Sequence, residues 1–139
     1  MKKSKKETSL QPRIRVYHAG EVALGPGKIE LLGYVAETGS LSEAARRMKM
    51  SYMKAWLLVQ IMNKSFRKPL VQLERGGAQG GGSGITETGR EVLDLYRAMH
   101  EESLKAAEAP WKQLSGLLKG GGSPTPSRAP LRKKREKKM

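Results

Sequence analysis

The chain has 139 residues, enough for one modest domain with tails, and 27 Lys and Arg against 13 Asp and Glu give it a net charge of +14. It contains no cysteine, which excludes disulfides, thiolate metal sites and cysteine nucleophiles. No apolar run approaches the ~18 residues of a membrane span, so we expect a soluble cytoplasmic protein without a membrane partner.

The positive charge is concentrated at the two ends of the chain. Residues 1–15 carry +5 and residues 119–139 carry +7, which leaves only +2 for residues 16–118. Such a balance favours a polyanionic partner, but the specific evidence must come from the middle of the chain. We predict a disordered basic arm over 1–12, a domain over 13–118 and a disordered basic tail over 119–139. The tails are either simply solvated, or form a nuclear-localisation-like run, or neutralise phosphates without specifying sequence.

The first elements form a predicted hairpin followed by a helix. Arg13–His18 alternates between apolar and polar residues, Ala19-Gly20 offers a turn, and Glu21–Leu24 is a second short strand. Two strands alone are marginal, so the hairpin should lean on another surface such as a partner subunit. Pro26 suits the first turn of a helix, and Gly39 suits its C-terminal cap. The apolar stripe between them is Ile29, Leu32, Gly33, Val35 and Ala36.

Two short helical patterns meet in Leu41–Asn63 at a break of three to four residues. Ser42 can cap the first helix and Ser51 the second. A helix, a tight turn and a second capped helix form a candidate helix-turn-helix, whose second helix can enter a DNA major groove. The same pattern also fits an ordinary helical hairpin in a small α domain.

The residues around this break divide into three predicted roles. Arg46, Arg47 and Lys49 are predicted to contact phosphates. The candidates for base or near-base contacts are Ser51, Tyr52, Lys54 and Gln60. Met53 and Leu57 fall opposite the apolar stripe and should face outward, where they either touch thymine methyl groups or bind a protein partner. Trp56 could pack at the edge of the core or face the groove, and we predict that it packs at the core.

A glycine-rich segment lies between two further strands. Leu70–Leu73 and Ile85-Thr86 are predicted to pair, with Arg75–Gly84 between them, as a two-stranded wing. A phosphate-binding loop is excluded because no Gly-Lys-Ser/Thr follows and no helix comes directly after the glycines. Such a wing tip either lets the backbone approach DNA closely or is merely a loose loop. Arg75 and Gln79 are its candidate polar contacts.

A long helix follows, capped by Thr86 or Thr88, with Val92, Leu95, Tyr96 and Met99 on one apolar face. Pro110 predicts a kink or break near Ala109. Further on, apolar residues repeat as a seam of barely two heptads; its members are Leu104, Ala107, Trp111, Leu114 and Leu118.

Neither histidine is part of a recognisable catalytic pattern. His18 and His100 lie far apart, without a neighbouring nucleophile pattern or metal-ligand spacing. The sequence therefore predicts no enzyme, no catalytic residues, no metal and no cofactor.

Residues 13–105 resemble the N-terminal DNA-binding domain of ModE-type molybdate-responsive regulators and, more distantly, the winged helix of LysR-type regulators. The motifs that carry the resemblance are Gly39-Ser40, Ala44-Ala45, Ser51-Tyr52, Ala55-Trp56, Met62-Asn63 and the wing GGAQGGGSG before Ile85-Thr86. The resemblance implies a homodimer joined by the long helix and the N-terminal hairpin. It also implies that Ser51–Gln60 reads the major groove and that the wing touches the flanking backbone.

Two features depart from this family pattern. ModE-type regulators carry C-terminal oxyanion-binding domains, whereas here a basic segment follows Leu118, so molybdate binding is not expected. Met53 and Leu57 stand where related recognition helices usually have polar or charged residues.

The sequence thus predicts a mainly α fold with small β structure: a winged helix-turn-helix with an N-terminal β-hairpin and a long C-terminal dimerisation helix. The predicted function is sequence-specific transcriptional regulation by a dimer on double-stranded DNA at the cytoplasmic nucleoid. A protein-interaction or nucleoid-type module with non-specific DNA affinity is the alternative. The predicted DNA contacts are Ser42, Arg46, Arg47, Lys49, Ser51, Tyr52, Met53, Lys54, Leu57, Gln60, Arg75 and Gln79.

Overall fold

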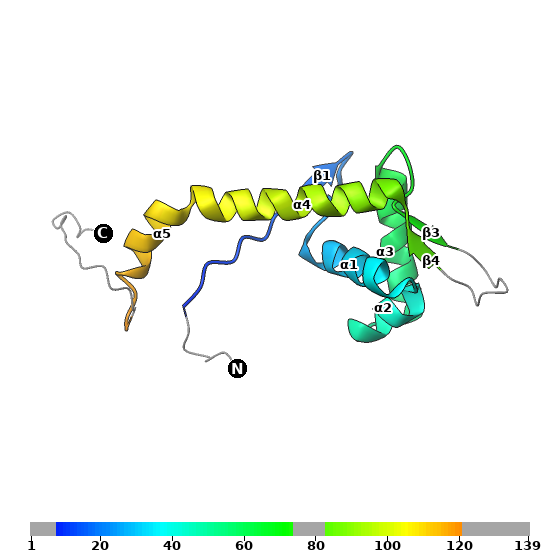
Figure 1. Cartoon of the computed structure of the whole chain (residues 1–139), viewed down its shortest axis with the longest axis horizontal. Helices are drawn as coiled ribbons and strands as arrows, with labels where there is room; N and C mark the ends of the chain where they lie inside the picture. Colours follow the sequence, from blue (N-terminus) through cyan, green and yellow to red (C-terminus); the bar gives the residue numbers. More distant parts are fainter. Residues whose placement is uncertain (1–7, 74–82, 121–139) are drawn as a thin grey trace. The chain divides into compact units, whose positions relative to one another are not determined.

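The computed structural model of the chain describes residues 8–73 and 83–120. Its elements are β1 (Val16–His18), β2 (Glu21–Leu24), α1 (Pro26–Thr38), α2 (Leu41–Arg47), α3 (Tyr52–Ser65), β3 (Val71–Leu73), β4 (Ser83–Ile85), α4 (Glu87–Ala106) and α5 (Glu108–Ser115) (Figure 1). Arg13–His100 form one compact unit, and the described parts of Met1–Pro12 and Glu101–Met139 form a second. The fold is mainly helical with small antiparallel β structure, which is compatible with a winged helix-turn-helix.

The N-terminal hairpin is present, with β1 antiparallel to β2 and His18 opposite Glu21. Its two turn residues both have positive φ, 50° at Ala19 and 79° at Gly20, as in the hairpin turns whose twist matches that of the strands. The first strand is shorter than predicted, beginning at Val16, where the register shifts.

Helix α1 begins at Pro26 and ends at Gly39, as predicted. Gly39 has a φ of 71°, and its amide donates to Val35 O at 2.8 Å, which closes the helix with a left-handed cap. Leu31 is fully buried although the predicted stripe omits it, because α1 is packed by α2, α3, β2 and β4 together.

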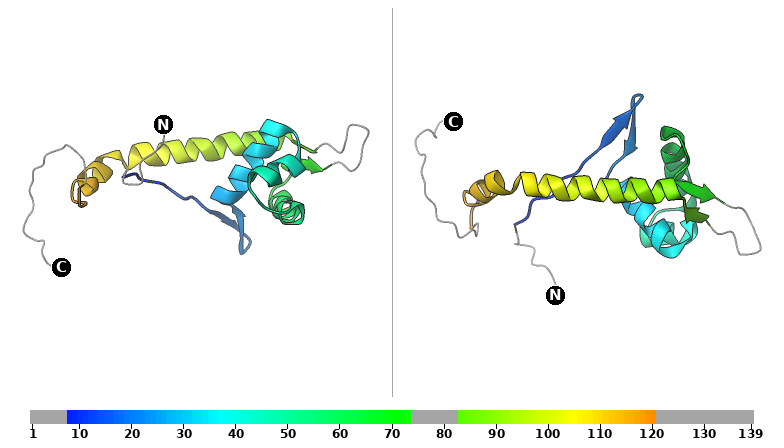
Figure 2. Two further views of the ribbon diagram at one scale, coloured as in Figure 1. Left: turned by 90° about the horizontal axis from the view of Figure 1, so that it is seen from below. Right: turned by 45° about the horizontal axis from the view of Figure 1, so that its top comes forward.

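The core of the Arg13–His100 unit is built where α1, α2 and α3 meet the beginning of α4. The largest fully buried side chains there are Leu31, Leu32, Val35, Leu41, Val59, Met62, Leu70 and Val71. Leu93 and Tyr96 of α4 join the same cluster. The two hairpins leave this helical core in different directions (Figure 2).

A second hairpin follows α3, with β3 antiparallel to β4 and Val71 opposite Ile85. The side-chain amide of Asn63 fixes its start. Asn63 Oδ1 accepts from the amides of Leu70 and Val71 at 2.8 and 3.2 Å, and Asn63 Nδ2 donates to Val71 O at 3.1 Å. The last turn of α3 and the first residues of the wing are therefore joined through one side chain.

Thr86 joins the other strand of the wing to α4. Its hydroxyl donates to Pro69 O at 2.8 Å and accepts from the amide of Gly89 at 2.9 Å, so it both anchors the strand and caps the helix. Of the two predicted caps, Thr86 is correct and Thr88 is wrong. The return strand ends at Ile85, one residue earlier than predicted, because Thr86 serves as the cap.

In the second unit the chain breaks at Ala107, between α4 and α5. The predicted break near Ala109 is present but displaced by two residues. Pro110 lies in the first turn of α5, where its missing N–H removes no helical hydrogen bond. Along the predicted seam, Leu104, Ala107 and Trp111 are half-buried, whereas Leu114 is 52% exposed.

Gly89 provides a test of how tightly α4 is seated against the wing. A Cβ at this position would overlap the carbonyl oxygen of Leu70 and approach Ile85 Cγ1 to 2.8 Å. We expect Gly89→Ala to lower the free energy of unfolding by about 1–3 kcal/mol in urea denaturation. The matched control is Gly27→Ala in α1, where a Cβ meets no atom within 4 Å and should leave stability unchanged or slightly raised. Equal losses in both variants would contradict the close packing at Gly89.

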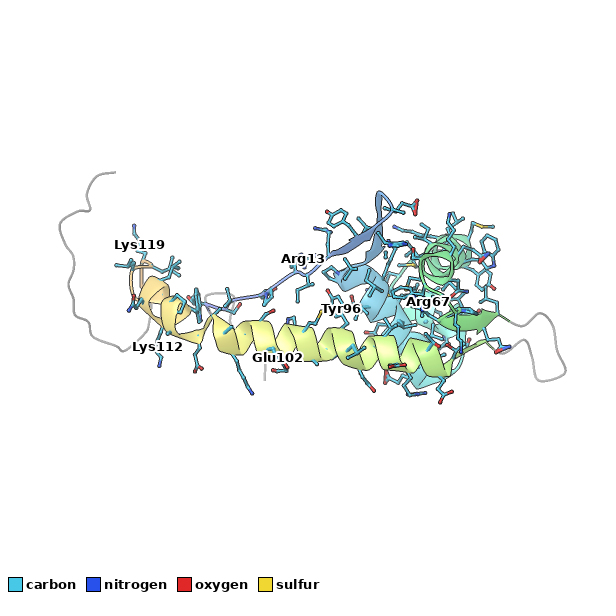
Figure 3. The ribbon with its side chains drawn as sticks, turned by 90° about the horizontal axis from the view of Figure 1, so that it is seen from above. Arg13, Arg67, Tyr96, Glu102, Lys112 and Lys119 are labelled. Carbon is cyan, nitrogen blue, oxygen red and sulfur yellow. The ribbon has the colours of Figure 1, made fainter. Side chains whose placement is uncertain are left out.

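Tyr96 ties α4 to the segment before β1. It is 5% exposed, and its hydroxyl donates to Ile14 O at 2.6 Å. Figure 3 shows the side chain on the side of α4 turned towards the chain at Arg13. Burial raises the pKa of the phenol above its usual value of 10.0, and the positive charges of Arg13 and Arg15 partly oppose this rise.

We expect Tyr96→Phe to lower the free energy of unfolding by about 1 kcal/mol near neutral pH, because the partly buried Ile14 carbonyl loses its donor. The difference from wild type should shrink as the pH rises above 10. Above this pH the phenol ionises in the unfolded chain before it ionises in the folded one. This lowers the free energy of unfolding of the wild type, whereas the Phe variant has no phenol to ionise at this position. Urea titrations between pH 7 and 11 measure this; a difference that grows with pH would contradict it. Tyr17→Phe, at a side chain 67% exposed, is the neutral-pH control and should change stability by less than ~0.5 kcal/mol.

Candidate nucleic-acid interface

The predicted helix-turn-helix segment folds as two helices joined by residues 48–51. The turn closes α2 with a paired cap in which the Met50 amide donates to Ala45 O at 3.0 Å and the Lys49 amide to Arg46 O at 3.1 Å. Lys49 occupies the left-handed position of this cap, with φ of 55°, where glycine is the usual residue. Ala44 and Ala55 are fully buried, so small side chains let the helices approach closely.

Serines cap both helices, but only one of them is the predicted one. Ser51 caps α3 by accepting from the Lys54 amide at 3.0 Å, which confirms the prediction. The predicted cap at Ser42 is wrong: Ser40 caps α2 by accepting from the Glu43 amide at 3.0 Å. Helix α2 begins at Leu41, so Ser42 lies within its first turn and is exposed.

Helix α3 has one buried and one exposed face. Ala55, Val59 and Met62 are fully buried. The exposed side chains over its first two turns are Ser51, Tyr52, Met53, Lys54 and Leu57. Gln60 is half-buried further along, and Trp56 packs against the core as predicted.

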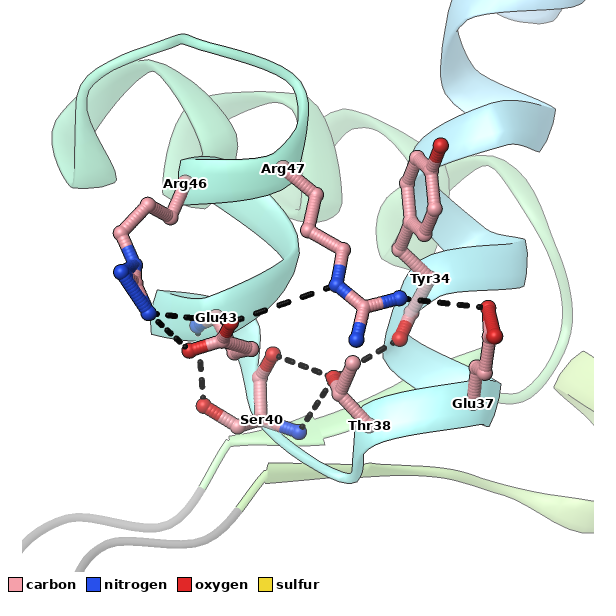
Figure 4. Close-up of polar contacts among 7 residues, drawn as sticks. All are labelled: Tyr34, Glu37, Thr38, Ser40, Glu43, Arg46 and Arg47. Carbon is pink, nitrogen blue, oxygen red and sulfur yellow. Dashed lines mark hydrogen bonds and ion pairs between the residues drawn. The ribbon is translucent and has the colours of Figure 1, made fainter.

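Arginines of α2 are paired with nearby carboxylates (Figure 4). Arg46 Nη2 lies 2.8 Å from Glu43 Oε1, and the Arg46 side chain is still 71% exposed. Arg47 Nη1 lies 3.7 Å from Glu37 Oε1, and its guanidinium lies 5.7 Å from the centre of the Tyr34 ring. Because exposed ion pairs contribute little to stability, these carboxylates orient the arginines without stabilising the fold appreciably.

The structure brings most of the predicted contact residues to one region. Ser42, Arg46, Arg47 and Lys49 lie on α2 and the turn. Gln60 lies in the third turn of α3, and the start of α3 carries Ser51, Tyr52, Met53, Lys54 and Leu57. Arg75 and Gln79 lie outside the described residues, as do most of the predicted arm and tail. Within the two described ranges, no three His, Asp or Glu side chains gather in a group suited to a metal ion. No helix in that part of the chain is both long and apolar enough to cross a membrane.

Sequence reasoning missed the residues that hold the interface in place. Asn63 was noted only as part of a family motif, although its amide connects α3 to the wing. Gly89 carries no local signal, since a glycine in the first turn of a helix has many explanations. The contact of Glu37 with Arg47 crosses from α1 to α2, so only the fold reveals it.

No family model matches the chain, but comparison with known proteins finds relatives of it. The molybdenum transport protein ModE of Azotobacter vinelandii is 35% identical over 98 residues, 70% of this chain and 36% of its own length. The molybdenum-pterin-binding protein MopA of Rhodobacter capsulatus is 32% identical over 117 residues, 84% of this chain and 41% of its own. The DNA-binding transcriptional dual regulator ModE of Escherichia coli is 35% identical over 81 residues, which are 58% of this chain and 31% of its own length.

The chain is a relative of the ModE-type regulators. The family prediction made from the glycine-rich wing and the helix-turn-helix motifs is therefore confirmed. The chain spans between about a third and two fifths of the length of these relatives.

At the turn of this chain, substitutions of Lys49 can separate an effect on stability from an effect of charge. Lys49→Gly should raise the free energy of unfolding by about 1 kcal/mol, because glycine adopts the left-handed conformation without strain. If Lys49 contacts a phosphate, the same change should reduce the slope of log affinity against log salt by about 0.9 on random-sequence duplex. Lys49→Arg keeps both the charge and the strain, so it should match wild type in both measurements. A Lys49→Gly protein no more stable than wild type would show that the turn is unstrained.

Proposed function

We propose that the chain is a sequence-specific, DNA-binding transcriptional regulator that acts as a dimer in the cytoplasm. The observation that carries the proposal is the exposed start of α3, a helix seated by a buried face and bordered by the basic residues of α2 and the turn. The names of relatives from Escherichia coli and Haemophilus influenzae, which describe transcriptional regulators, support it. The proposed role is therefore binding and not catalysis.

In the proposed complex α3 enters the major groove with its N-terminal end first. Side chains near the start of a recognition helix reach base edges, and Ser51, Tyr52 and Lys54 are exposed there. The Ser51 oxygen accepts from the Lys54 amide, which leaves its hydroxyl hydrogen to donate to a base or phosphate. Gln60 is half-buried and contacts the groove only at its edge.

Phosphate contacts come from α2, the turn and the wing. Ser42, Arg46 and Arg47 would reach the backbone on one side of the groove, with phosphates replacing the carboxylates that now face the two arginines. Arg75 and Gln79 are proposed to touch the flanking backbone or minor groove from the wing. The basic residues of 1–12 and 119–139 are proposed to add affinity without adding sequence preference.

The proposed dimer is joined through the β1–β2 hairpin and α4. Leu95 and Met99 of α4 are 58% and 41% exposed, so an apolar surface is present in the unit formed by Arg13–His100. A two-fold dimer would require two half-sites about one helical turn, ~10 bp, apart or a multiple of it. Because the chain spans only part of its relatives' length, the molybdenum in their names is not carried over to it.

A second candidate function is a protein-interaction or nucleoid-type module with only non-specific DNA affinity. The exposed Met53 and Leu57 favour it, because apolar side chains on a recognition helix also suit a protein surface. The two candidates differ in one respect: only the regulator selects a DNA sequence.

Selection of genomic fragments by the pure full-length protein tests the proposal. We expect the recovered fragments to share a palindromic motif with the half-site spacing given above. Lys54→Ala should then weaken binding to that motif by about 1–3 kcal/mol and bind random duplex almost as well as wild type.

Lys64→Ala, at an exposed lysine in the last turn of α3, is the matched control and should affect motif and random duplex alike. Equal losses for Lys54→Ala on both duplexes would make it a phosphate contact. Recovered fragments without a common motif would support the interaction module instead.

A further inference from the structure

From the exposed face of α3 we infer that Met53 and Leu57 read thymine, by packing against the 5-methyl groups that thymines present in the major groove. This inference rests on the proposed function. Met53 is 59% exposed and Leu57 is 49% exposed, whereas Ala55 and Val59 on the opposite face are fully buried. The two exposed residues, termed the Met53–Leu57 patch, are not needed by the core of the chain itself.

The spacing of the patch suits neighbouring base pairs. Residues four apart in an α-helix lie on one face and rise by about 6 Å along the axis. Successive nucleotides of a strand are about 3.4 Å apart in duplex DNA, so the patch spans roughly two base-pair steps. It would therefore contact two thymines that are adjacent or separated by one base pair.

The surroundings of the patch favour DNA over a protein partner. Lys54 lies between the two apolar residues in sequence and is exposed, and the positive end of the helix dipole is next to them. Arg46 and Lys49 of the neighbouring helix and turn are also exposed. The DNA major groove places apolar thymine methyl groups between two rows of phosphates, which matches an apolar patch bordered by cations.

A protein partner and an RNA helix both fit the Met53–Leu57 patch less well than duplex DNA does. A stable protein interface buries about 800 Å² on each partner and excludes charge from its centre, whereas this patch has only two apolar side chains, with the exposed Lys54 beside them. RNA helices have a deep, narrow major groove that side chains do not read, and RNA lacks the thymine methyl. The chemistry therefore indicates duplex DNA with thymines in each half-site.

The decisive experiment replaces each thymine of the selected site by deoxyuridine, which removes only the methyl group and keeps base pairing. Wild-type protein should bind about fourfold more weakly for each contacted methyl, the effect expected from burying one such group. One or two thymines in each half-site should respond, and the others should not.

Substitutions in the Met53–Leu57 patch test whether these two residues cause the loss of affinity on uridine substitution. Met53→Ala and Leu57→Ala should each weaken binding to the thymine site and abolish the uridine effect at one position, as a double-mutant cycle requires of a direct contact. Leu117→Ala, at a leucine 86% exposed in the second unit, is the matched control and should keep the full uridine response. Lys54→Ala should also keep it.

The outcomes separate this inference from the function on which it rests. A protein that selects a motif but tolerates uridine at every thymine would overturn the inference and leave the regulator intact. Uridine effects that persist in both patch variants would assign the methyl contacts to other residues. A protein that selects no motif would overturn the inference and the proposed function together. The uridine series uses wild-type protein, so it remains decisive even if a variant folds poorly.

Discussion

The hydrogen bonds of the Asn63 side chain fix the arrangement of α3 and the wing in the candidate nucleic-acid interface. One residue in the last turn of α3 satisfies two backbone amides and one carbonyl at the start of the wing. The carbonyl of Leu70 in turn accepts from the amide of Thr86 at 2.9 Å, and Thr86 caps α4. Helix α3, the wing and α4 thus share one hydrogen-bonded junction. Because these backbone groups are buried or partly buried, breaking one of these contacts would leave polar groups without partners, which is costly.

Much of the fold could be predicted because its signals are local. Pro26, Gly39 and the Ala19-Gly20 turn each act through the conformation of their own backbone, and the structure has each where predicted. Ser51 caps α3 because a hydroxyl three residues before a free amide needs no help from distant residues. The outward direction of Met53 and Leu57 likewise follows from helical periodicity alone.

The misplaced predictions share a different cause. Ser40 replaces Ser42 as a cap, and Thr86 is used instead of Thr88, because each helix begins where packing places it and several hydroxyls were available nearby. Gly89 is required only because the backbone of Leu70 crosses it. The basic residues of the candidate interface could be predicted from the sequence, but the carboxylates that pair with them could not. What each of these side chains contacts on DNA stays a prediction.

Several residues that are unfavourable for the isolated chain lie around the turn and the start of α3. Lys49 adopts a left-handed conformation at the end of α2, whereas the cap of α1 uses Gly39 for it. Large apolar side chains there face solvent, although the buried face of the same helix is well packed. Sequences that fold well normally satisfy local rules at every position, so a cluster of departures marks a surface kept for another purpose. The proposed duplex DNA partner would cover these apolar groups and neutralise the positive charges beside them.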